Sequence, residues 1–133
     1  MRSFHDYWLT GHSVDGEGGV LTLRLCEDPR EVEKPEKVDL VFTGLMDYFL
    51  EHDLGVSIVF SVEERALDSF IADNLGQFTE HAKWGWPKFW KGDSATSQAF
   101  LAERQCHVWE LKTSYGLSGW IVAAQADERA SVV

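Results

Sequence analysis

The segment at residues 81–92 has the most unusual chemistry in the sequence. It carries three tryptophans, three lysines and no acidic residue, whereas the whole 133-residue chain has a formal net charge of −10. Indole faces offer flat apolar area and attract cations, so this segment could hold a sugar, a nucleobase or an anionic small molecule. The candidate ligand-binding residues are Trp84, Trp86, Lys88 and Trp90. The favoured interpretation is nevertheless structural, with Trp84, Trp86 and Phe89 locking a loop onto the sheet while the lysines stay solvated.

The acidic residues outside this segment form a second candidate surface. A chain this acidic repels nucleic-acid phosphates and anionic membranes, so neither general nucleic-acid binding nor membrane binding is expected. A basic protein partner would be attracted, and complementary charge raises the association rate. The candidate partner-binding residues are Glu27, Asp28, Glu31, Glu33, Glu36, Asp47, Glu51 and Asp53. A third interpretation is a homodimer that uses exposed aromatic residues as its contact patch.

No arrangement of nucleophile, acid and base is visible. Cys106 and His107 are neighbours on a predicted strand, where adjacent side chains point to opposite faces. Glu63 and Glu64 are better explained as the acidic first turn of a helix. The stretch at 116–119 lacks the GxSxG pattern of a nucleophile elbow. The sequence therefore predicts no catalytic residue and favours a non-enzymatic protein.

Metal and cofactor motifs are also missing from the sequence. The five histidines form neither a His-x-His nor an HExxH spacing, and no glycine-rich nucleotide motif occurs, so no metal site and no cofactor are expected. Cys26 and Cys106 belong to no CxxC motif and are expected to be buried thiols. Because neither an export signal nor an apolar stretch of about 20 residues is found, we expect a soluble, cytoplasmic protein.

These candidates must be positioned by an α+β fold, predicted as one domain over residues 1–133. A helix from about residue 62 to about 77 is predicted, because Ser61 and Glu64 have the spacing of a capping box. A second short helix is expected up to Arg104, capped by Asp93 or Ser94. Residues 125–133 are expected to be a flexible tail. Alternating apolar residues predict strands at 4–10, 20–26, 38–50 with a break at Gly44, 56–62, 106–112 and 119–124.

Runs of strands separated from helices indicate a mainly antiparallel sheet of about six strands, ordered as four strands, one or two helices and two strands. The succession of a hairpin, an acidic loop and the stretches 38–45, 56–60 and 115–120 resembles small uncharacterised bacterial α+β proteins. Some of those are immunity proteins encoded beside polymorphic toxins. The resemblance implies a non-enzymatic, cytoplasmic protein that neutralises a partner, and it transfers no residue roles.

Two functional hypotheses follow from the sequence. The leading one is an immunity-type inhibitor whose acidic surface binds a basic partner such as a toxin. The alternative is a small-ligand-binding or enzymatic domain built on the segment at 81–92.

Overall fold

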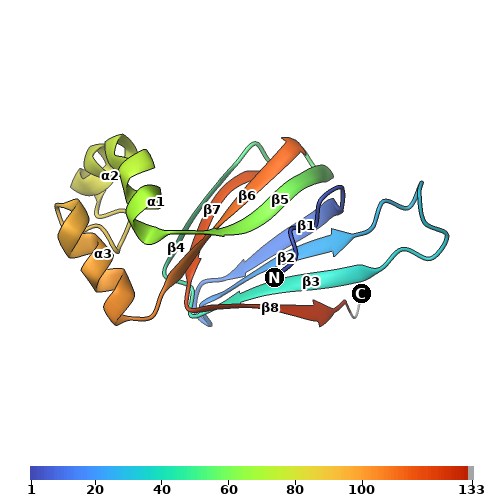
Figure 1. Cartoon of the computed structure of the whole chain (residues 1–133), viewed down its shortest axis with the longest axis horizontal. Coiled ribbons are helices and arrows are strands. Elements are labelled where there is room, and N and C mark those ends of the chain that lie inside the picture. Colours follow the sequence, from blue (N-terminus) through green and yellow to red (C-terminus); the bar gives the residue numbers. More distant parts are fainter. Residues whose placement is uncertain (132–133) are drawn as a thin grey trace.

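Antiparallel strands dominate the computed structural model, which describes residues 1–131 (Figure 1). Within these residues the chain forms one eight-stranded antiparallel sheet, three α-helices and one 3₁₀ turn. The elements in chain order are β1 (Trp8–Asp15), β2 (Val20–Cys26), β3 (Lys37–Thr43), β4 (Asp47–Glu51), β5 (Ser57–Arg65), α1 (Leu67–Asp73), α2 (Leu75–His81), η1 (Ala82–Trp84), α3 (Ser94–Glu103), β6 (His107–Tyr115), β7 (Ser118–Ala123) and β8 (Gln125–Ala130).

The sheet has the strand order β4-β7-β6-β5-β1-β2-β3-β8 and folds back on itself. Strand β3 pairs with β8 and strand β4 pairs with β7, so one long hairpin bends at Gly44 and Ala124. The backbone N–H of Ala124 donates to the carbonyl of Thr43 at 3.0 Å across this bend. Leucines of β2 and β3 therefore share one buried core with Trp109 and Ile121 from the other half of the sheet.

A second core lies between the sheet and the helices, which gather at one end of the strands (Figure 1). Trp120 and Val122 of β7 face the helices, whereas Ile121 and Ala123 face the first core. Because side chains alternate along a strand, this stretch of β7 is buried on both faces, which explains its uninterrupted apolar sequence. The helical side of this core is built from Phe70, Ile71, Phe78, Phe89 and Leu101.

The predicted α+β class and antiparallel sheet are confirmed, but the element counts were too low. The break expected at Gly44 divides residues 38–50 into β3 and β4, because Gly44 has a positive φ of 63° and an added Cβ would lie 2.7 Å from that of Ala124. The flexible tail predicted at 125–133 is wrong up to Ala130. Those residues form β8, because their backbone pairs with β3 in spite of their charged side chains. Residues 132 and 133 lie outside the described part of the chain.

The boundaries of the first helix were also predicted wrongly. Glu63 and Glu64 still belong to β5, where they pair with residues of β6, so Ser61 and Glu64 form no capping box. The helical stretch begins at Leu67 and is interrupted at Asn74. The first strand begins at Trp8 rather than at residue 4.

The second predicted helix is confirmed as α3. The carboxylate of Asp93 accepts a hydrogen bond from the backbone N–H of Thr96 at 2.7 Å and so caps the helix. That bond is also the main cause that lowers the pKa of Asp93. Among residues 1–131, no helix is long and apolar enough to span a membrane.

Gly119 of β7 allows β4 to approach closely, and this contact can be tested by substitution. Its φ is +153°, and a Cβ there would collide with the carbonyl oxygen of Phe49. Gly119→Ala should therefore lower the free energy of unfolding by roughly 1–3 kcal/mol. The matched control is Gly76→Ala in α2, where the new methyl group has open space around it. This variant should raise the free energy of unfolding by up to about 1 kcal/mol. Equal effects in urea unfolding would contradict this account.

Candidate functional site

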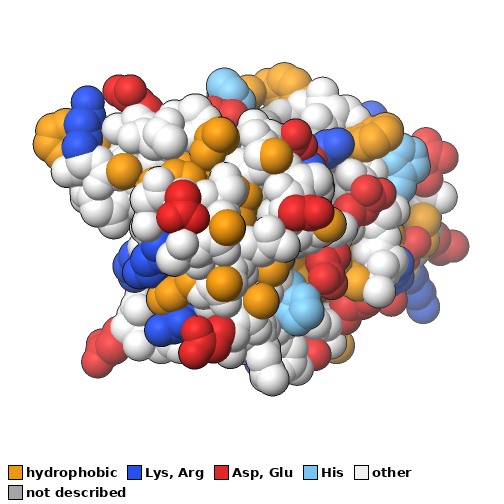
Figure 2. Space-filling model, turned by 60° about the vertical axis from the view of Figure 1, so that its left-hand side comes forward, with side chains coloured by type: hydrophobic (Ala, Val, Ile, Leu, Met, Phe, Trp, Pro, Cys, Tyr) orange, Lys and Arg blue, Asp and Glu red, His pale blue; other side chains and the backbone are white. Residues whose placement is uncertain are grey.

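The acidic turns lie at the end of the sheet remote from the helices, which we call the turn end (Figure 1). It comprises the N-terminal segment 1–7, the β2–β3 loop at 27–36, the β4–β5 turn at 52–56 and the β6–β7 turn at 116–117. They share this end because antiparallel strands alternate in direction. On the face that Figure 2 shows, acidic side chains are scattered with hydrophobic side chains between them.

Some of the acidic residues predicted to bind a partner instead make contacts within the protein. Asp28 pairs with Arg30 at 2.8 Å, and this hydrogen bond is the main cause that lowers the pKa of Asp28. Glu27 accepts the backbone N–H of Glu36 at 2.8 Å across the base of the β2–β3 loop. These carboxylates shape the loop, whereas Glu31 and Glu33 are exposed at its outer part.

The N-terminal segment anchors the same loop. Glu36 accepts hydrogen bonds from the Tyr7 hydroxyl at 2.8 Å and from Arg2 at 2.7 Å. Arg2 also donates to Glu128 of β8 at 3.0 Å. The Tyr7 bond is the main cause that lowers the pKa of Glu36, and burial raises the pKa of Tyr7 to about 12. The β2–β3 loop is therefore tied both to the N-terminal segment and to the last strand.

Asp47 was predicted to bind a partner, and the structure contradicts this. Its side chain is buried, with the residue 4% exposed, and it accepts the backbone N–H groups of Lys88 and Phe89, each at 3.1 Å. Burial is the largest influence on this carboxyl and raises its pKa. Asp47 therefore joins the segment at 81–92 to β4 instead of contributing to an acidic surface.

The turn end also exposes apolar side chains that sequence reasoning missed. Leu54 and Val56 in the β4–β5 turn are 59% and 48% exposed, Phe60 of β5 is 53% exposed, and Tyr115 at the end of β6 is 58% exposed. Phe60 lies at an irregularity in the β5–β6 register, where a bulge redirects a side chain. The apolar residues flanking Gly55 were the available signal, because turns are usually polar. Glu51 and Asp53 are exposed beside them.

The four candidate ligand-binding residues of the segment at 81–92 do not converge. Trp86 stacks on Trp120 with ring centres 5.7 Å apart, and Trp90 packs against Phe78. Trp84 is 75% exposed, so the expectation that it locks the loop is wrong. Phe89 is fully buried and does hold the segment in place, as predicted.

Trp86 and Lys88 alone among these four line a hollow of about 580 Å³, which we call the β4 hollow. Its floor is β4, one side is the tip of the β1–β2 hairpin with Val14 and Gly16, and the other is the segment that carries His81, Trp86 and Lys88. The His81 ring packs edge-on against Trp86 with ring centres 5.3 Å apart. This geometry supports the ligand-binding alternative only in part.

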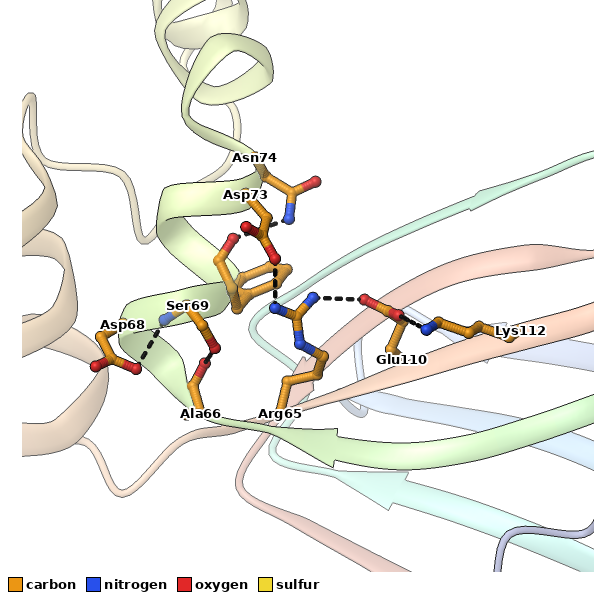
Figure 3. A network of polar contacts seen from close by, with 9 residues as sticks. Arg65, Ala66, Asp68, Ser69, Asp73, Asn74, Glu110 and Lys112 are labelled. Carbon is orange, nitrogen blue, oxygen red and sulfur yellow. Dashed lines mark hydrogen bonds and ion pairs between the residues drawn. The ribbon is translucent and has the colours of Figure 1, made fainter.

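The remaining polar clusters have structural roles. Arg65 at the end of β5 donates to Asp73 of α1 at 2.5 Å and to Glu110 of β6 at 2.8 Å, so it fastens the helices to the sheet (Figure 3). Glu110 is also paired with Lys112 at 3.2 Å. The hydrogen bond to Asp73 is the main cause that raises the pKa of Arg65.

The cysteines and histidines build no reactive site in the described residues. Cys106 is buried in the helical core, while His107 is exposed and contacts Glu64 at 3.0 Å, so the two point apart as predicted. Cys26 and Cys106 are both free and buried, which confirms that expectation. Within residues 1–131 no three His, Cys, Asp or Glu side chains come together in a way that could hold a metal ion.

Comparison with protein-family models, with curated proteins and with solved structures finds no match to this chain.

Removing the Asp47 carboxylate should destabilise the protein in a pH-dependent way. Asp47→Ala leaves the part-buried N–H of Lys88 and the buried N–H of Phe89 without their acceptor, at a cost of up to roughly 1–3 kcal/mol each. Because the pKa of Asp47 in the folded protein is raised above 3.8, protonation of Asp47 stabilises the wild-type fold as the pH falls through that raised pKa towards 3.8, and the variant lacks this gain. The difference in unfolding free energy between the wild type and Asp47→Ala, measured in urea, should therefore increase at acid pH.

Asp53→Ala is the control for this measurement, since Asp53 is exposed and contacts only the nearby N–H of Gly55. The role of Asp47 would be contradicted if both variants lost a similar unfolding free energy relative to the wild type. It would also be contradicted if the loss in Asp47→Ala became smaller at acid pH.

Tyr7 offers a spectroscopic check on the anchoring of the β2–β3 loop. In an alkaline absorbance titration, one of the three tyrosines should ionise near pH 12, and Tyr7→Phe should remove that step. Its raised pKa stabilises the fold below about pH 10, and this contribution is lost as pH rises from about 10 to about 12. Ionisation of all three tyrosines together near pH 10 would refute the Tyr7–Glu36 hydrogen bond.

Proposed function

We propose that this chain is a non-enzymatic binding protein, an immunity-type inhibitor that holds a basic protein partner, such as a toxin, against its turn end. The observation that carries the proposal is the group of four apolar side chains exposed there at 48–59% among acidic turns. These four residues are Leu54, Val56, Phe60 and Tyr115. Large exposed apolar residues with a charged rim are typical of protein–protein interfaces.

Charge at the turn end favours a basic partner over an acidic one. The β2–β3 loop has five acidic and two basic residues, and the β4–β5 connection at 51–56 has two acidic residues and no Lys or Arg. The exposed members of this set are Glu31, Glu33, Glu36, Glu51 and Asp53. Of these, Glu36 is already bonded to Tyr7 and Arg2. Rim charges of this kind steer a partner during encounter and make the association rate depend on salt.

Preorganisation supports the same proposal. The β2–β3 loop is held at its base by Glu27, and by Glu36 through Tyr7 and Arg2. A loop that is already ordered loses little conformational entropy when it binds, so more of the contact free energy appears as affinity.

The proposal is tested by capture of partners from the native host lysate, followed by kinetics with the captured protein. We expect a protein rich in Lys and Arg whose association rate falls with added salt. Glu31→Lys should slow association about tenfold at low salt, and Tyr115→Ser should speed dissociation because it removes an apolar contact.

Glu103→Lys at the end of α3 is the matched control, since it makes the same charge change on an exposed residue at the other end of the molecule. Equal slowing by the two charge reversals, binding indifferent to salt, or capture of no basic protein would each overturn the proposal. A homodimer formed through Tyr115 would also overturn it, because it would occupy the same surface.

A further inference from the structure

A hollow of about 540 Å³ lies on the sheet beside the β2–β3 loop, and we call it the loop-base hollow. The strand register places Trp8 of β1 opposite Cys26 of β2, and Cys26 opposite Lys37 of β3. Arg24 stands two residues before Cys26 and so shares its face of the sheet, opposite to the face of the buried leucines of β2. The sheet thus brings an aromatic ring and two cationic side chains to this hollow, and all three line it.

Apolar side chains form much of the wall of the loop-base hollow. Pro29 and Pro35 of the β2–β3 loop line it together with Trp8 and Leu25. Small-ligand sites commonly have volumes of about 300–1,000 Å³ and apolar walls with a few polar groups among them. The polar side chains in this lining are Thr10, Arg24, Lys37 and Ser131. The hollow therefore suits a ligand with an apolar body and one polar end.

The charged residues of this lining are both basic. They are Arg24 and Lys37, and no Asp or Glu among residues 1–131 lines the hollow. Neither side chain forms an ion pair with a described residue, and both residues are exposed. The anionic end of a ligand can therefore pair with them without displacing an internal contact.

The acidic residues next to the loop-base hollow are balanced by other cations. Asp28 is engaged by Arg30, whose Nε donates to Oδ1 at 3.0 Å and whose Nη2 donates to Oδ2 at 2.8 Å. Asp39 stands opposite Arg24 on one side and opposite Arg129 of β8 on the other, so two cations flank one carboxylate. These two carboxylates therefore leave the cationic lining in place.

Glu27 and Glu36 adjoin lining residues in the chain but face the N-terminal segment. Glu27 accepts the backbone N–H of Glu36, and Glu36 accepts hydrogen bonds from Tyr7 and Arg2. Glu27 lines a separate hollow with Tyr7. The loop therefore carries its acidic residues away from the loop-base hollow while its two prolines line it.

We propose that the loop-base hollow binds a small aromatic carboxylate, whose carboxylate group pairs with Arg24 and Lys37 and whose ring lies against Trp8 and the two prolines. A phosphate dianion suits the hollow less well, because its strongly hydrated oxygens would lose water against apolar walls. The site uses none of the exposed apolar residues of the turn end, so it stands or falls independently of the proposed function.

The test uses 2-naphthoate, a flat apolar ring with one carboxylate, titrated against the full chain by calorimetry and by ¹H–¹⁵N NMR. We expect saturable binding at one site, with the largest NMR shifts at the Trp8 indole N–H and at the backbone N–H groups of Arg24 and Lys37. The uncharged 2-naphthamide should bind about tenfold more weakly, because it cannot form the charge-assisted hydrogen bonds.

Variants of the two cations test the proposed contacts directly. Arg24→Gln and Lys37→Gln should each weaken 2-naphthoate binding about fivefold, because each removes one ion pair near the surface. Arg24→Lys keeps the charge and should retain most of the affinity. The matched control is Lys34→Gln, which removes the same charge from an exposed residue of the same loop that does not line the hollow. It should leave the affinity unchanged.

Several outcomes would overturn the proposal. Absence of saturable binding up to about 10 mM 2-naphthoate would do so, as would equal affinity for 2-naphthamide, which is expected of apolar contact alone. Equal weakening by Lys34→Gln and Lys37→Gln would indicate general charge attraction instead of a site. NMR shifts centred on Val56, Phe60 and Tyr115 would place the ligand on the apolar residues of the turn end.

Discussion

The packing of aromatic rings around Trp120 is the interaction on which the helical half of the molecule depends. Phe70 and Phe78 reach this ring from α1 and α2, at 5.3 and 5.9 Å between ring centres, and Trp86 and Phe89 reach it from the segment at 81–92. Helices of seven residues are too short to be stable alone in water, so their stability comes from this contact with the sheet. The same rings place His81, Trp86 and Lys88 beside β4.

The bend of the sheet at Gly44 and Ala124 determines which surfaces remain available. It carries β4 away from β3 and leaves β4 with one paired neighbour, while β8 occupies the other edge. Because each half of the sheet buries one face against the other half, the helices can cover only one further face. The opposite end of the strands remains uncovered, and there the apolar residues and the acidic turns are exposed together.

The turn end and the β4 hollow differ in the charged side chains that they present. The turn end exposes acidic side chains among apolar ones, whereas Lys88, His81 and the buried Asp47 all line the β4 hollow. The Asp47 carboxylate accepts hydrogen bonds from two backbone N–H groups and so joins the segment at 81–92 to β4.

The sequence by itself determined the α+β class, the alternating strands, the break at Gly44 and a cap of α3 at Asp93 or Ser94, because each depends on residues close together in the chain. Only the tertiary structure decided that the charged residues 125–130 form a strand, that Asp47 is buried and that Trp84 is exposed. Asp47 meets N–H groups 41 and 42 residues away, and β8 depends on the free edge of β3. These features depend on which distant segments pack together, and the local periodicity of the sequence does not indicate that pairing.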